Sequence, residues 1–413
     1  MSNVLNPYFP EYWAKVAQEI YQPKAIYRQV ASFRAEPIMK NGDVFHRVLP
    51  SVVPIQPYQR YSTLTPSSIS GTDQSLTVNL ENVFIFQVDD LDQVQANLAL
   101  GPTYSSTAII GMNNVIDSSM LGQVVNATSV VDNGTLSTGT PDGLPITLNG
   151  SNVAEVFSLG KQKLAEQNID LNDLFIGIDP ASSHVIETNV ASRETNRVGD
   201  DATVNGYMGN MYKFFDIDAY MTNNYLSSRT LKLATNPTNG DTLTITLGTV
   251  YGPVVCTFTF VSVIGSTAGN VLIGGSADAT RANLAALINA PGTTTANGVG
   301  FSNISNEYFT LAVSCSAVND DALNTLTFYA EGRSIATASS LTAGTDGWDA
   351  TKAGKHLMFA QRGAVDMVVQ VAPTMQVRLE PRGFESNIMG KSLWGRKTFT
   401  DGSKKMVDIF VKA

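Results

Sequence analysis

Residues 43–87, DVFHRVLPSVVPIQPYQRYSTLTPSSISGTDQSLTVNLENVFIFQ, contain two strand-like limbs joined by a long crossing. In the returning limb, Leu76, Val78 and Leu80 alternate with polar residues, which is the period of a strand with one apolar face. The crossing, residues 50–73, is punctuated by prolines. A loop of this length without its own structure is uncommon in a compact domain, and is usually a functional arm or a disordered insert. If it is an arm, it needs a surface on which to lie.

The composition is that of a folded, β-rich protein. The chain has 413 residues, of which 43% are hydrophobic and 15% charged. This length suggests about two to four domains or subdomains, and the low share of charge argues against general disorder. The formal net charge is −9, which argues against a nucleic-acid binder of the basic-patch kind, because an acidic wall repels DNA.

The chain shows no targeting signal. No apolar stretch approaches the roughly 20 residues that span a bilayer, and the N-terminus, MSNVLNPYFPEYW, lacks the features of a signal peptide. We therefore expect a cytoplasmic origin. Cys256 and Cys315 lie in strand-like runs and could pair if their strands face each other, although cytoplasmic thiols normally stay reduced.

Several segments have helical periodicity. Trp13, Val16 and Ile20 share one face of an N-terminal helix, which is either an ordinary core helix or a docking arm. Apolar residues recur at helical spacing over 103–122, where Gly101-Pro102 should delay the start. A further helix is expected after Asn152, capped by that residue with Glu155 at its third position. Its predicted apolar stripe consists of Val153, Val156, Phe157, Gly160 and Leu164. The run LFIGIDP that follows predicts a buried central strand, and hence an α+β or α/β layer.

Residues 231–346 have the pattern of a separate unit. Short strands with alternating Thr residues surround one helical segment, and charged residues are sparse. We interpret this unit as a small β-sandwich with one helix, inserted into the host fold at a surface loop. After it, strand patterns return, and the final run, residues 406–411, predicts a C-terminal strand tied into a sheet.

The chemistry of a catalytic or metal site is missing from the sequence. The histidines, His46, His184 and His356, are scattered, and two cysteines cannot supply a tetrahedral zinc site. No motif of a serine hydrolase, a phosphate-binding loop, a zinc protease or an EF-hand occurs. We therefore predict no enzyme activity, no metal and no cofactor.

The order of elements, with N-terminal helix, extended hairpin, long helix, α/β unit and closing strands, resembles the major capsid proteins of tailed bacteriophages with the Hong Kong 97-like coat fold. The resemblance covers roughly residues 1–230 and 347–413 and depends on the order of loose local patterns. These are NGDVFHRV (41–48), FIFQVDDLDQVQANL (84–98), MNNVIDSSMLGQV (112–124), LFIGIDPASSHVI (174–186), GYMGNMYKFFDIDAYMTNNY (206–225) and GFESNIMGKSLWGRKTF (383–399).

The resemblance implies an α+β fold with a specific division of the chain. The parts are an N-arm (1–42), an E-loop (43–87), a peripheral domain with the spine helix (88–125), an axial domain (126–230), an insertion domain (231–346), the axial return (347–381) and peripheral strands (382–413). The insertion departs from the minimal family pattern.

The resemblance also implies a function. It is self-assembly into hexamers and pentamers of an icosahedral head that encloses double-stranded DNA, in a virion assembled in the host cytoplasm. The implied partners are other copies of the chain, a portal, a separate scaffolding protein and a decoration protein, with only weak contact to DNA and none to a membrane. Because no lysine lies between Lys40 and Lys161, we expect no lysine cross-link from the E-loop. The alternative is a carbohydrate-binding or adhesive β-rich phage protein whose activity resides in residues 231–346.

Aromatic and arginine side chains suit the anchoring of interfaces. On this basis we name two groups of candidate assembly residues. The residues of the second group could equally well pack in a β-core of the same chain. The first group is Trp13, Val16 and Ile20 with Tyr58, Arg60 and Tyr61, and the second is Arg382, Phe384, Trp394 and Arg396.

Overall fold

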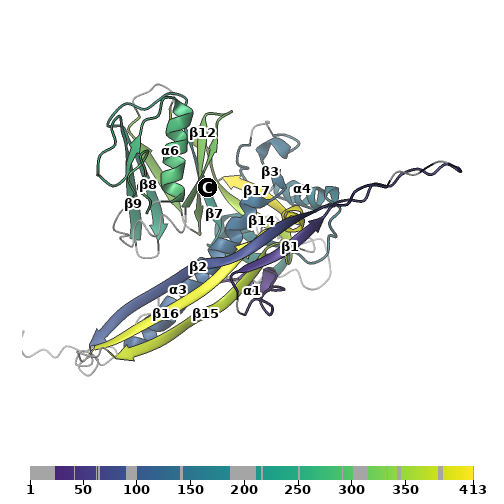
Figure 1. Ribbon diagram of the computed structural model, residues 1–413, viewed down its shortest axis with the longest axis horizontal. Helices are drawn as coiled ribbons and strands as arrows, with labels where there is room; N and C mark the ends of the chain where they lie inside the picture. The colour runs from purple at the N-terminus through teal and green to yellow at the C-terminus, as the bar shows by residue number, and fades with distance from the viewer. Residues whose placement is uncertain are drawn as a thin grey trace, which may run out of the picture.

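A computed structural model shows three β-sheets with helices packed on them (Figure 1), which confirms the mixed, β-rich α+β class. The structure describes residues 24–40, 42–61, 63, 66–89, 100–139, 143–186, 211–214, 217–249, 252–290, 292–300, 315–332, 334–341, 346–379 and 385–412. Within this part of the chain, no helix is long and apolar enough to cross a membrane.

The first sheet is long and narrow. It has the antiparallel order β1-β2-β16-β15, and the strands are β1 (Val44–Pro50), β2 (Gly71–Asp89), β16 (Glu385–Lys397) and β15 (Asp366–Leu379). The two limbs predicted within 43–87 are therefore β1 and β2, which pair from Val44↔Thr77 to Pro50↔Gly71. The rest of β2 pairs with β16, more than 290 residues later in the chain.

The long helix α3 (Leu100–Leu121) lies against β15, β16 and β2 (Figure 1). It begins at Leu100, three residues earlier than expected, and includes Gly101-Pro102. A proline in the first turn costs little, because the N–H that it lacks would have no helical partner there. The short 3-10 helix η2 (Gly122–Asn126) follows α3 directly.

The second sheet has nine strands and forms the centre of the molecule. Its main path is β11-β12-β7-β14-β4-β6-β5, while β17 pairs with β14 and β3 pairs with β17. Its strands are β3 (Ser129–Val131), β4 (Leu174–Ile178), β5 (Met211–Phe214), β6 (Ile217–Met221), β7 (Leu226–Lys232), β11 (Cys315–Asp320), β12 (Thr325–Glu331), β14 (Gly347–Gln361) and β17 (Met406–Lys412). Two predictions are confirmed: β4 is buried along its length, and the C-terminal strand β17 is tied into the sheet.

Helix α4 (Val153–Glu166) packs against β17 and β3. Its predicted apolar stripe is the buried one, with Val153 and Leu164 fully enclosed. The predicted capping pair is wrong. The side chain of Asn152 accepts from Asn149 N at 2.9 Å, and Glu155 accepts from Ser137 N at 2.6 Å, so both stabilise the preceding loops instead of the helix start.

The third sheet lies within the 231–346 segment. Its order is β10-β9-β8-β13, and α6 (Ala277–Asn289) packs against β10, β11 and β12. The strands are β8 (Thr242–Thr249), β9 (Gly252–Val261), β10 (Asn270–Leu272) and β13 (Ile335–Ser339). The two cysteines fall in different sheets, Cys256 in β9 and Cys315 at the start of β11.

The 231–346 segment is not self-contained. Strands β11 and β12 belong to the central sheet, because β12 pairs with β7 from Thr325↔Lys232 to Glu331↔Leu226. One hydrophobic core nevertheless joins Leu243 and Phe258 of the small sheet to Leu326 and Phe328 of β12. The segment therefore uses an extension of the host sheet as the second layer of its own core.

The described chain begins at residue 24 and is packed into the body from there. Ile26 and Val30, at and in the short helix α1 (Tyr27–Val30), are each 1% exposed, and Met39 is 4% exposed. The helix predicted on Trp13, Val16 and Ile20 lies outside the described residues. The other short elements are η3 (Asn133–Thr135), a helical turn at residues 180–186, and α8 (Thr400–Lys404).

Candidate assembly surface

Residues 51–70, called the arm below, extend away from the rest of the molecule between β1 and β2 (Figure 1). Each described residue from 48 to 73 is exposed. The arm nevertheless carries large apolar side chains, of which Ile55 is 98% and Tyr61 93% exposed. Among the described residues of the arm, the large exposed apolar ones are Val52, Val53, Ile55, Tyr58, Tyr61 and Ile69. A concentration of exposed apolar surface of this kind marks a site of interaction with another molecule.

The backbone ladder of β1 and β2 extends into the base of the arm. Ser51 N donates to Ser70 O at 2.9 Å, which continues the β1–β2 ladder by one step. Beyond that step, Pro54, Pro57 and Pro66 remove N–H donors, and a ladder cannot continue through them. The sequence therefore makes an extended segment that does not fold back on the sheet.

A second exposed apolar surface lies at the far end of β2. Val83 is 77% and Ile85 67% exposed, and they face Lys391 and Met389 of β16 across the ladder. The strand between residues 71 and 85 is about 45 Å long at the usual rise per residue. The arm and this patch therefore lie at opposite ends of one long sheet.

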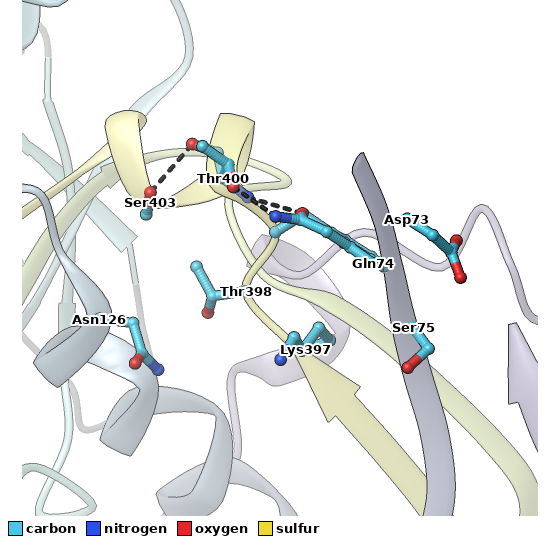
Figure 2. Close-up of a pocket in the computed structure, with 9 residues that line it drawn as sticks. Asp73, Gln74, Ser75, Asn126, Lys397, Thr398, Thr400 and Ser403 are labelled. Atoms are coloured by element: carbon cyan, nitrogen blue, oxygen red, sulfur yellow. Dashed lines mark hydrogen bonds between the residues drawn. The ribbon is translucent and has the colours of Figure 1, made fainter. Parts of the chain in front are cut away.

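A polar pocket lies beside the base of the arm (Figure 2). Its volume is about 480 Å³, and β2 supplies one wall while the end of β16 and α8 supply the other. The lining residues are Asp73, Gln74, Ser75, Asn126, Lys397, Thr398, Phe399, Thr400 and Ser403. Its side chains are mostly hydroxyls and amides, which suit hydrogen bonding rather than acid–base chemistry.

The residues predicted to make assembly contacts are found in different environments. Tyr58 and Tyr61 are 67% and 93% exposed on the arm, and Arg60 between them is exposed as well. Trp394 is 1% exposed in the core under α3, so its indole packs within this chain. Outside the described residues lie Trp13, Val16, Ile20, Arg382 and Phe384.

Arg396 also makes its contacts inside the chain. Its guanidinium donates to Glu331 Oε1 at 2.7 Å, and both side chains are 19% exposed. Burial raises the pKa of the Glu331 carboxyl, and the positive charge of Arg396 opposes that rise. The pair joins β16 to the end of β12, so it ties the first sheet to the central sheet.

Of the predicted residues that the structure describes, only Tyr58, Arg60 and Tyr61 are therefore brought to one exposed surface. The apolar residues that surround them, such as Val52 and Ile55, were not singled out. The sequence did contain a signal for them. They are large aliphatic residues between the prolines of a segment that has neither helical nor strand periodicity.

A serine, a histidine and an aspartate meet in the central sheet. His356 Nδ1 lies 2.7 Å from Asp408 Oδ2, and its Nε2 lies 2.9 Å from Ser228 Oγ. The same connectivity activates the nucleophile in serine hydrolases. Here, however, Ser228 is 1% and His356 8% exposed, so the hydroxyl is closed to a substrate unless the strands separate.

This trio has a structural explanation. The ring of His356 stacks on Phe410 with centroids 4.5 Å apart, and Tyr329 lies on another side at 5.5 Å. Burial, together with the charge of Asp408, raises the pKa of Tyr329 to about 12. The hydrogen bonds join β7, β14 and β17 across partners 52 and 128 residues apart. The sequence did not predict the trio, because residues so far apart in the chain have no local spacing that indicates their contact.

Among the residues that the structure describes, no group of three or more His, Cys, Asp or Glu side chains could hold a metal ion. His46 Nδ1 lies 2.7 Å from Asp73 Oδ2 at the base of the arm, where both side chains are more than half exposed. This isolated pair joins β1 to β2.

No family model matches the chain, and no curated protein matches it. Solved structures do match. A structure from Mycobacterium phage Che8 has a TM-score of 0.55 at 12% identity, with 97% of this chain and 96% of that chain covered. The capsid structure of the cyanophage P-SCSP1u has a TM-score of 0.54 at 10% identity, with 100% and 96% covered. At these identities the likeness is one of fold: the chain folds as phage capsid structures do, and the resemblance inferred from the sequence is confirmed at that level.

Proposed function

We propose that this chain is the major capsid protein of a tailed phage with the Hong Kong 97-like coat fold. Copies of it assemble into the hexamers and pentamers of an icosahedral head that encloses double-stranded DNA. The observation that carries the proposal is the arm, whose described residues present six large apolar side chains to solvent. Exposed apolar side chains are stabilised when they are buried against another molecule. In a shell, that molecule is a second copy of the chain.

The placement of the two apolar surfaces supports repeated assembly. The arm lies at one end of β2, and the Val83–Ile85 patch lies at the other. Two different surfaces on one chain favour head-to-tail contacts, which close into rings when the rotation between copies permits. Many repeated contacts of modest size then give a durable particle through multivalency.

The net charge of −9 fits a container for DNA. An acidic wall lets packaged DNA move without adhering, because counterion release provides affinity only where phosphates meet basic side chains. On this proposal, DNA contact is weak and non-specific, and the particle is assembled in the host cytoplasm with a portal and a separate scaffolding protein. A decoration protein is a further proposed partner. The chain acts by contact and not as an enzyme.

We assign the parts of the chain on the same proposal. The N-arm is 1–42, the E-loop 43–87, the peripheral domain 88–125 and 382–413, and the axial domain 126–230 and 347–381. Residues 231–346 form the insertion domain. Solved capsid folds cover 97–100% of this chain, which favours one role for the whole chain over an adhesive role for the insertion alone.

Expression of the chain, followed by size-exclusion chromatography and negative-stain microscopy, tests the proposal. Wild-type protein is expected to form shells, tubes or capsomers. A variant in which residues 52–69 are replaced by a short Gly-Ser linker is expected to remain a folded subunit, because the described residues of this range are exposed, but not to assemble. A stable wild-type monomer that binds glycans would overturn the proposal in favour of the adhesive alternative. Unfolding of the linker variant would show that the arm belongs to a core.

A further inference from the structure

The arm leaves the body at one cross-strand pair. Arg47 of β1 and Gln74 of β2 lie directly opposite each other in the ladder. Both are partly buried, whereas each described residue from 48 to 73 is exposed. Arg47 and Gln74 are therefore the partly buried cross-strand pair nearest to the arm.

Arg47 is held from two directions. Its Nη1 lies 3.1 Å from Asp366 Oδ2 at the start of β15, and its Nη2 lies 2.5 Å from Asp401 Oδ2 in α8. The guanidinium also lies over the ring of Phe399, 5.1 Å from its centroid. Because the guanidinium is a planar fork, two carboxylates on different elements define the direction of the side chain as well as its position.

Gln74 makes the matching contact on the other strand. Its Nε2 donates to Thr400 Oγ1 at 2.5 Å, and its Oε1 accepts from Thr400 N at 3.2 Å (Figure 2). Thr400 and Asp401 are the first two residues of α8. The opposed pair at the base of the arm, Arg47 and Gln74, is thus bound by two consecutive residues of α8.

Space remains for the arm to move if these contacts break. The pocket of about 480 Å³ opens beside Gln74, between β2 and α8. From residue 50 to the tip the arm is on the order of 30 Å long at the usual extension per residue. A rotation of about 10° at the base therefore moves the tip by roughly 5 Å, which is enough to misplace its side chains on a neighbour.

We propose that Arg47 and Gln74, bound to Asp366, Thr400 and Asp401, form a clamp that sets the direction of the arm and hence the geometry of assembly. This inference rests on the proposed function. Arg47 and Gln74 act as positioning residues, since they direct the arm without forming its contact surface. Polar contacts suit this role because they are directional and can be broken and remade without exposing a core.

The test compares Arg47→Ala and Asp401→Asn with Arg28→Ala. Asp401→Asn preserves the shape of a partly exposed side chain, so it guards against a simple folding defect. Arg28 is the control, because it too pairs with a carboxylate, Glu36 at 3.5 Å, and lies over an aromatic ring, Phe33 at 4.9 Å, but on the body.

Two measurements decide the result. In unassembled subunits, hydrogen exchange of backbone amides in 44–50 and 71–77 should rise about tenfold in both clamp variants, the effect of losing a charge-assisted hydrogen bond, and should not change in Arg28→Ala. Under assembly conditions, electron microscopy should show a changed distribution of particle diameters for the clamp variants only. Unchanged exchange and diameters, or equal effects in the control, would overturn the clamp. If wild-type protein never assembles, the proposed function fails, while the exchange measurement still decides whether the clamp exists.

Discussion

The carboxylate of Asp117 in α3 accepts a hydrogen bond from the backbone N–H of Ile26 at 2.8 Å, across 91 positions of the chain. The same oxygen accepts from Tyr27 N at 2.8 Å, and the other oxygen accepts from Asn224 Nδ2 at 2.9 Å. Asp117 therefore supplies partners for the first N–H groups of α1, which has no capping side chain of its own. One buried carboxylate attaches the N-terminal segment to the long helix.

Asp117 should make the stability of the subunit depend on pH. Burial raises the pKa of this carboxyl from 3.8 to about 6, against the opposing effect of its hydrogen bonds. The folded state then binds the proton more tightly than the unfolded state. The cost of the buried charge is therefore present above pH 6 and disappears as the pH falls from about 6 toward 4.

Asp117→Asn measures this contribution directly. Relative to the variant, the wild-type free energy of unfolding should increase by up to about 3 kcal/mol between pH 7 and pH 4, as the shift in pKa implies. Denaturant unfolding of both proteins at each pH gives the difference, and other titrating groups cancel. A wild-type-minus-variant difference that is constant with pH would contradict the assignment.

The buried trio of Ser228, His356 and Asp408 should matter for stability and not for catalysis. His356→Ala leaves the carboxylate of Asp408 buried without its ring partner, so we expect a loss of about 3 kcal/mol or more. Ser228→Ala removes one hydrogen bond and should cost about 1 kcal/mol. Thermal denaturation checks both values. A Ser228→Ala variant that lost assembly while it kept wild-type stability would show that the hydroxyl has a role other than packing.

A side chain at position Gly395 should destabilise the subunit. It lies where the pairing of β16 with β2 shifts register, and a Cβ there would approach the backbone of Thr77 and lie 2.8 Å from Val78 Cα. We expect Gly395→Ala to cost about 1–3 kcal/mol, because strand backbones cannot move apart without loss of the ladder. Gly275→Ala is the control, since nothing lies within 4 Å of its Cβ position. Equal melting temperatures for the two variants would contradict this packing argument.

The apolar side chains of the arm should affect assembly alone. Val52→Ser with Ile55→Ser should change the free energy of unfolding of the subunit by less than about 0.5 kcal/mol, since both residues are exposed. The same variant should assemble poorly, because it removes apolar surface from the proposed contact. Val263→Ser with Leu323→Ser changes exposed apolar residues away from the arm and is the control. Light scattering during assembly measures the difference, and equal yields of particles for both variants would exclude the arm as the contact.

Local patterns predicted elements well where one physical signal dominated. The stripe of α4 and the buried run of β4 were both found, because apolar periodicity reports burial directly. The cap of α4 was wrong because Asn149 and Ser137, in the preceding loops, compete for the same side chains. At Trp394 the sequence left core and interface open, and the structure places it in the core.

By itself, the sequence determined that residues 43–87 contain two strand-like limbs joined by a long, proline-spaced crossing, since the alternation of the limbs and the missing N–H groups of the prolines are properties of the chain. Only the tertiary structure decided which strands are neighbours. Sheet pairing joins backbone groups that are the same in every residue, so the pattern of β12 could not reveal that its partner is β7 of the host fold. The clamp of Arg47 by Asp366 and Asp401 had no sequence signal for a different reason: its partners are 319 and 354 residues away, and only folding brings these side chains together.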